Sequence, residues 1–157
     1  MSQRPVDDET LTRNMNELLQ ELRVAQTGVQ ILTGFLLTVP FTDRFPDLDD
    51  LQRNTYLTVL CGAVLTTALV VAPVAFHRVL FRRRMRRWLV EAANIAARAG
   101  LMMLALTSSG ALFLVFDVVT SRTAAIVALV AGIVLFLAIW LVPPLFADHD
   151  EHARERA

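Results

Sequence analysis

Residues 56–76 read YLTVLCGAVLTTALVVAPVAF, a stretch without a single charged residue, and it decides the class of fold. A helix needs about 20 such residues to cross the roughly 30 Å of hydrocarbon in a bilayer. Three more apolar segments of similar length occur at residues 24–41, 99–119 and 123–142. Because a bilayer offers the backbone no hydrogen-bond partners, segments of this kind span it as helices. The sequence therefore predicts an all-α polytopic membrane protein with four transmembrane helices in an antiparallel bundle.

The composition agrees with a membrane protein and argues against a nucleic-acid partner. Hydrophobic residues make up 55% of the 157 positions, and the formal net charge is zero. A chain without net charge has no general attraction to DNA or RNA, so we expect none as a partner. All 15 basic residues are Arg, which indicates a GC-rich bacterial source because Arg codons are rich in G and C. The lone cysteine, Cys61, excludes an intramolecular disulfide and a cysteine-based zinc site.

The segments between the spans divide the chain further. The first span runs into the acidic loop FTDRFPDLDD, residues 41–50, and Asp117 to Arg122 is so short that the last two spans must form a tight hairpin. Pro143 and Pro144 are expected to end the last helix. The predicted organisation is a polar N-terminal segment at 1–16, a four-helix transmembrane domain at 17–146 with a basic loop at 77–98, and a charged tail at 147–157.

The loop between the second and third spans sets the predicted orientation. Residues 77–88, HRVLFRRRMRRW, contain six Arg, whereas the other two connections have two and one. Arg and Lys beside spans favour the cytoplasmic side, so this loop is predicted to lie inside, close to anionic lipid headgroups. An even number of spans then places both termini in the cytoplasm. The expected location is the bacterial inner membrane, with the acidic first loop outside.

The first span carries polar residues along one face. At about 100° per residue its polar side chains fall within one narrow sector, and weaker stripes occur in the next two spans. Polar groups are costly against lipid, so this face is expected to point into the bundle or toward a homo-oligomer or another membrane protein. The candidate polar seam comprises Gln20, Arg23, Thr27, Gln30, Thr58, Thr66, Asn94, Arg98 and Ser109. Three interpretations stay open: a site for a small ion, water or headgroup, hydrogen-bonded contact between helices, and a first span that lies flat at the membrane interface.

Charged residues at the cytoplasmic ends of the spans suggest ion pairs between helices. The candidates are Glu17, Glu21, Arg78, Arg82 and Glu91.

Proton-coupled transport would require a carboxylate within the hydrocarbon, and the sequence places none there, since Asp117 ends the third span. The last span has Ala124, Ala128 and Gly132 at a spacing that suits close helix contact.

No pattern of catalytic chemistry is present. The chain lacks the motifs GxxxxGK[ST], HExxH, GxSxG and CxxC, so we expect no enzyme, catalytic residue or cofactor. The tail motif DHDEH has spacings that suit a metal, but a short solvated tract without a surrounding fold favours a charged tail. No metal site is therefore predicted.

Four short motifs resemble a known family: ELRVAQTGVQILTGFLLTVPF, then RF, QRNTY and APVAFHRVLFR. The resemblance covers about residues 17–83 and is to small uncharacterised membrane proteins of GC-rich Gram-positive bacteria. It implies a membrane protein of unknown function, and the sodium/proton antiporter label that some members carry implies transport. Taken with the residues, this leads us to expect an accessory, interaction or lipid-associated membrane protein. The alternative is a small secondary transporter that works as an oligomer.

Overall fold

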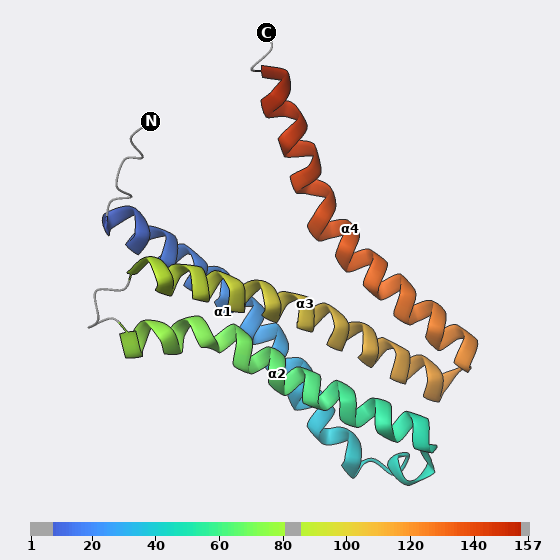
Figure 1. The fold of residues 1–157 in the computed structure, drawn as a ribbon. Helices are drawn as coiled ribbons and strands as arrows, with labels where there is room; N and C mark the ends of the chain where they lie inside the picture. The colour runs from blue at the N-terminus through green and yellow to red at the C-terminus, as the bar shows by residue number, and fades with distance from the viewer. Residues whose placement is uncertain (1–7, 81–85, 155–157) are drawn as a thin grey trace.

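The fold consists of four long helices joined by short connections. The computed structural model describes the backbone of residues 8–80 and 86–154 and the side chains of residues 13, 17, 20–76 and 91–140. Figure 1 shows helices and no strand among these residues, so the all-α prediction is confirmed. The elements are α1 (Asp8–Thr38), the 3-10 helices η1 (Val39–Phe41) and η2 (Phe45–Asp47), α2 (Asp50–Leu80), α3 (Arg86–Val119) and α4 (Arg122–Arg154).

Each long helix contains a stretch that is long and apolar enough to cross a bilayer. The stretches are Gln20–Phe41, Asp50–Phe76, Glu91–Val119 and Arg122–Trp140. They include every predicted span apart from residues 141–142, so the predicted number of spans is confirmed. The first three also begin four to eight residues earlier than predicted, because the polar residues that precede each apolar segment are helical.

The predicted end of the last helix differs from the structure in an informative way. Helix α4 continues to Arg154, although Pro143 and Pro144 were expected to end it. Proline removes one backbone donor but holds φ near the helical value of about −65°, so a helix can run through it with a weakened ladder. Helix α2 extends to Leu80 and α3 begins at Arg86, as expected from the absence of Gly and Pro between His77 and Gly100.

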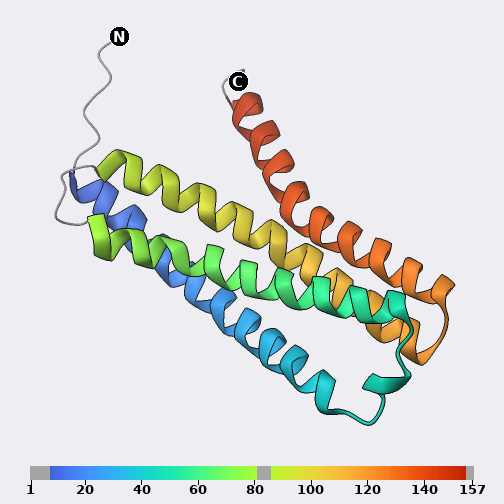
Figure 2. The ribbon, with the colours of Figure 1, turned by 60° about the horizontal axis from the view of Figure 1, so that its bottom comes forward.

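The helices are not packed equally against one another. Helices α2 and α3 lie side by side and antiparallel, and α1 crosses this pair and packs against both. Among the described residues α4 packs against α3 alone, and Figure 2 shows that it diverges from the bundle toward its C-terminal end. None of the described helices therefore covers the outer side of α1.

Small residues form the contacts between helices. Ala63, Ala93 and Ala125 are completely buried, and a Cβ added to Gly62 or Gly132 would lie within 3 Å of a side chain on α3. In lipid the hydrophobic effect does not drive helices together, so van der Waals packing must stabilise their contacts. Small residues favour this packing because they let two helix backbones approach closely. The predicted close contact of the last span is found at Gly132, which faces α3.

The end of α1 is stabilised by a side chain from α2. Pro40 has no N–H to donate to the carbonyl of Leu36, four residues earlier, in the α-helical pattern. The Tyr56 hydroxyl donates to that carbonyl instead, at 3.0 Å, and the Phe45 ring packs edge-on against Tyr56 with centroids 5.4 Å apart. An unpaired carbonyl would be costly in an apolar environment, so this bond fixes the position of the α1–α2 connection.

Replacing Tyr56 with Phe should therefore lower the free energy of unfolding by about 1–2 kcal/mol, because the buried Leu36 carbonyl loses its donor while the ring remains. Thermal unfolding in detergent, followed by circular dichroism, measures the change. Thr58→Val is a suitable control, since Thr58 is exposed and bonds only to Asn54 of its own helix. Equal melting temperatures for Tyr56→Phe and wild type would contradict the assignment of this bond.

Candidate functional site

The first turn of α2 builds one side of a polar site. Asp49 precedes the helix and accepts a hydrogen bond from the Gln52 N–H at 2.8 Å, and the Gln52 side-chain oxygen accepts the Asp49 N–H at 3.1 Å. This reciprocal arrangement is a capping box, which satisfies two backbone donors that a helix start leaves free. The Gln52 amide nitrogen remains available, and it points toward the end of α3.

Asp117, in the last turn of α3, receives that amide nitrogen. Gln52 Nε2 donates to Asp117 Oδ2 at 3.0 Å, across 65 positions of sequence. The Asp117 side chain is only 2% exposed, and a carboxylate near a helix C-terminus is disfavoured by the helix dipole. A compensating positive charge is therefore required beside it.

Arg122, at the start of α4, supplies this charge and closes a ring. Its Nε donates to Asp117 Oδ1 at 2.6 Å, and its Nη2 donates to Asp49 Oδ2 at 3.1 Å. Asp49, Gln52, Asp117 and Arg122 thus form a cycle of hydrogen bonds, which we call the Asp117 ring. The ring joins the α1–α2 loop, α2, α3 and α4 at one end of the bundle. None of its members was predicted from the sequence to form a site.

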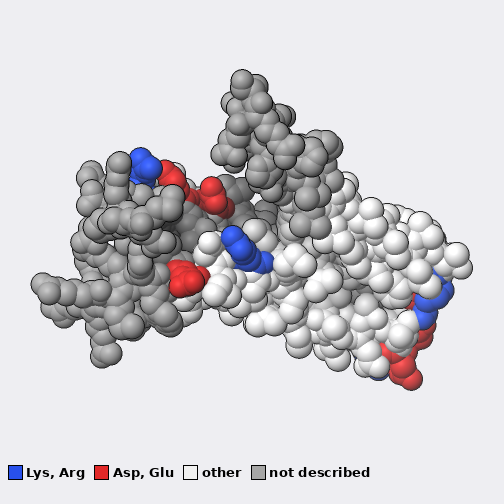
Figure 3. Space-filling view, turned by 45° about the horizontal axis from the view of Figure 1, so that its top comes forward, with Lys and Arg blue, Asp and Glu red and all other residues white. Residues whose placement is uncertain are grey.

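The ring belongs to a charged end of the molecule. Figure 3 shows charged side chains gathered at this end, separated from the other charges on the same face by a broad uncharged band. Two carboxylates and one guanidinium leave the ring with one formal negative charge. Among the described residues no cluster of three or more His, Cys, Asp or Glu is arranged to hold a metal ion. The arrangement suits a structural role, in which the ring holds the ends of α2, α3 and α4 together at the membrane surface.

The polar stripe of α1 faces away from the bundle. Gln20, Arg23, Thr27 and Gln30 are all exposed, whereas the opposite face of α1 is buried against α2 and α3 through Leu22, Val29 and Leu36. The structure therefore excludes the expected direction into the bundle for these four residues.

The other members of the predicted seam are not brought together. Thr58, Asn94 and Arg98 are exposed, while Thr66 and Ser109 are completely buried. The Thr66 hydroxyl donates to the Gly62 carbonyl of its own helix at 2.7 Å, and the Ser109 hydroxyl lies against Gly132 of α4. No hydrogen bond joins seam residues of different helices among the described side chains.

The predicted ion pairs are described only in part. Glu17 lies 3.7 Å from Arg13 of its own helix, with both side chains mostly exposed, and Glu21 and Glu91 are exposed. Exposed pairs of this kind contribute little to stability. The side chains of Arg78 and Arg82 lie outside the described residues, so pairing of these two with Glu17 or Glu21 stays a prediction.

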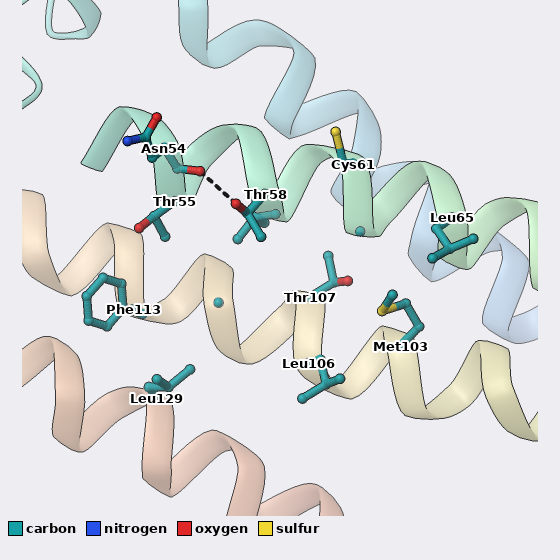
Figure 4. Close-up of a pocket in the computed structure, with 13 residues that line it drawn as sticks. Asn54, Thr55, Thr58, Cys61, Leu65, Met103, Leu106, Thr107, Phe113 and Leu129 are labelled. Atoms are coloured by element: carbon teal, nitrogen blue, oxygen red, sulfur yellow. Dashed lines mark hydrogen bonds between the residues drawn. The ribbon is translucent and has the colours of Figure 1, made fainter. Parts of the chain in front are cut away.

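A groove of about 650 Å³ lies between α2 and α3, with Leu129 of α4 at its edge. Figure 4 shows Thr55, Thr58 and Phe113 at one end and Leu65 and Met103 at the other. None of its lining residues is charged, and its surface is mainly apolar, with the Asn54 amide and the hydroxyls of Thr55, Thr58 and Thr107 as its polar groups. Thr107 of α3 lines this groove, and its hydroxyl is buried without a hydrogen-bond partner among the described residues.

These features define the chain as a polytopic α-helical membrane protein with the Asp117 ring at one end. The chain belongs to the family of unknown function DUF6328, whose sequence profile matches residues 5–144. The match covers most of the chain and all four apolar stretches, so it extends well beyond the motifs at 17–83. No curated protein and no solved structure shows a significant match.

Proposed function

We propose that this chain is an accessory or interaction protein of the bacterial cell membrane that associates with a partner within the bilayer and performs no catalysis. One observation carries the proposal: α1 presents its polar stripe outward, away from its own bundle. Lipid tails cannot satisfy such groups, so a second protein surface is required to cover them.

The residues of the stripe differ in how much they need that surface. Thr27 already donates to the Arg23 carbonyl at 3.1 Å, and Thr38, an exposed residue further along the same face of α1, donates to the Phe35 carbonyl at 2.7 Å. The Gln30 side chain makes no hydrogen bond to any described residue, although it lies well inside the stretch Gln20–Phe41. An amide at this depth is the strongest reason to expect association.

The orientation follows from the positive-inside rule and is part of the proposal. The Arg-rich connection between α2 and α3 lies in the cytoplasm beside anionic headgroups, and the Asp117 ring lies outside. Similarity to membrane proteins of GC-rich Gram-positive bacteria supports a bacterial cell membrane. Reporter fusions after Asp49 and after Arg84 test this, and a fusion after Arg84 that reports from the outer side would reverse it.

Purification from native membranes in mild detergent should retrieve the protein in a stoichiometric complex, either with itself or with another membrane protein. Thr27→Leu combined with Gln30→Leu should dissociate this complex, because the stripe becomes compatible with lipid. Val130→Leu on the exposed face of α4 is the matched control and should leave the complex intact. A lone monomer, or a complex that the stripe variant leaves unchanged, would contradict the proposal.

A small secondary transporter is the alternative, in line with the antiporter label of some similar proteins. Asp117 favours it, because this carboxylate is buried at the end of a membrane-spanning stretch. Its direct ion pair with Arg122 argues for a structural role instead. Proteoliposomes under a proton or sodium gradient decide the matter: flux with wild type that Asp117→Asn abolishes supports transport, and no flux under either gradient contradicts it.

A further inference from the structure

We infer that the partner of the α1 stripe is a second copy of this chain, bound α1 to α1 in a parallel pair. This rests on the proposed function and identifies the partner that it requires.

The stripe has the spacing of a helix pair. Gln20, Arg23, Thr27, Gln30 and Gly34 are separated by three, four, three and four residues. A repeat of seven residues keeps one seam of a helix facing its neighbour when two helices coil around each other. All five residues are exposed, and the face that carries them is opposite the one buried in the bundle. The seam is therefore presented to a helix from outside the chain.

Membrane topology determines how two copies can meet. Copies that insert with the same orientation are related by an axis along the membrane normal, so their α1 helices run parallel and each residue meets its counterpart at the same depth. The seam must then be complementary to itself. Gln30 meets this condition, because an amide both donates and accepts, and two Gln30 side chains can satisfy each other.

The neighbours of Gln30 permit the close approach that such a bond needs. A Cβ built on Gly34, one turn further along, would have no atom within 4 Å, so the α1 backbone is open there. Glycine at a helix interface lets two backbones come together. Arg23 is the one like-charged position on the seam. It lies close to the polar end of the span, so its long side chain can extend away from its counterpart into water.

The shape of the bundle leaves room for the second copy. Helix α1 packs against α2 and α3, and α4 packs against α3 only, so no described helix of this chain covers the outer side of α1 (Figures 1 and 2). The same argument does not extend to the apolar groove at Leu129, since lipid tails satisfy an apolar surface.

Disulfide cross-linking in intact membranes tests the pair. In a Cys61→Ser background, which removes the only native cysteine, Gln30→Cys should form a covalent dimer on oxidation. Two positions serve as controls: Gly28→Cys, at similar depth on α1 but off the seam and equally open, and Val130→Cys on the exposed face of α4. We expect the dimer yield of Gln30→Cys to be at least fivefold higher than that of either control. Equal yields at the three positions, or no dimer at Gln30, would overturn the inference.

A second measurement needs no cysteine. Gln30→Leu should weaken self-association in detergent by about 3- to 30-fold, the range for an interhelical hydrogen bond in membranes, while the melting of the monomer stays unchanged. An unaltered association constant would overturn the inference. The two proposals fail differently: a complex with another protein through the stripe refutes the second copy alone, whereas a lone monomer refutes both.

Discussion

Asp117→Ala is expected to lower the free energy of unfolding by about 2–3 kcal/mol. The substitution removes the acceptor of both Gln52 Nε2 and Arg122 Nε, and leaves a guanidinium beside a buried site. Loss of one partner from a fully buried ion pair costs about 3–5 kcal/mol. The smaller value applies here because the Arg122 side chain is 46% exposed and can turn toward water.

Thermal unfolding in detergent measures this change, and two variants make it specific. The melting temperature of Asp117→Asn should lie between those of wild type and Asp117→Ala. The new amide keeps one acceptor oxygen, but its NH₂ group faces a donor of Gln52 or Arg122. Asp43→Ala is the matched control, since Asp43 is an exposed acid of the same end of the molecule. A melting temperature of Asp117→Ala equal to that of the control would show that the ring contributes nothing to stability.

Gly62→Leu is the second large expected effect. A Cβ at this position would lie 2.8 Å from Thr107 Oγ1, closer than real Cβ contacts, so either the Thr107 side chain or the spacing of α2 and α3 must change. Overpacking of this kind costs about 1–3 kcal/mol, and the upper end applies because α2 and α3 form the main contact of the bundle. The loss should appear as a lower melting temperature and reduced yield of folded protein.

The clash with Thr107 can be isolated by a second substitution. Gly62→Ala should destabilise less than Gly62→Leu, and adding Thr107→Ala should recover most of that loss, since the variant removes the atom that the new Cβ meets. Gly28→Leu is the control, because nothing lies within 4 Å of a Cβ there. Equal losses at Gly28 and Gly62 would contradict the close contact between α2 and α3.

The helices were predictable because apolar length alone is a strong signal in a membrane protein. Segments such as 56–76 contain no charge, and the hydrogen-bonding demand of the backbone leaves one conformation available. The hairpin between α3 and α4 was equally visible in the shortness of 117–122. The continuation of α4 past Pro144 was not, since a proline is compatible with a helical φ and the sequence does not show how the freed carbonyl is satisfied.

The Asp117 ring could not be predicted, because the two bonds that close it join residues 65 and 73 positions apart. Only the local part left a signal: Asp49 and Gln52 have the spacing of a capping box. The stripe of α1 was visible as a pattern, yet its direction was not. In a bilayer both faces of a helix can meet apolar surroundings, so the pattern shows which residues need partners and leaves open on which side those partners lie.

The bond from Tyr56 to Leu36 has a consequence for biosynthesis. The carbonyl of Leu36, at the end of α1, finds its donor 20 residues later, in a helix that enters the membrane after α1. Completion of the first span therefore waits for the second, and these two helices mature as a unit. The Asp117 ring forms only when Arg122, at the start of α4, is in place. Insertion of the last helix therefore completes the assembly of the protein.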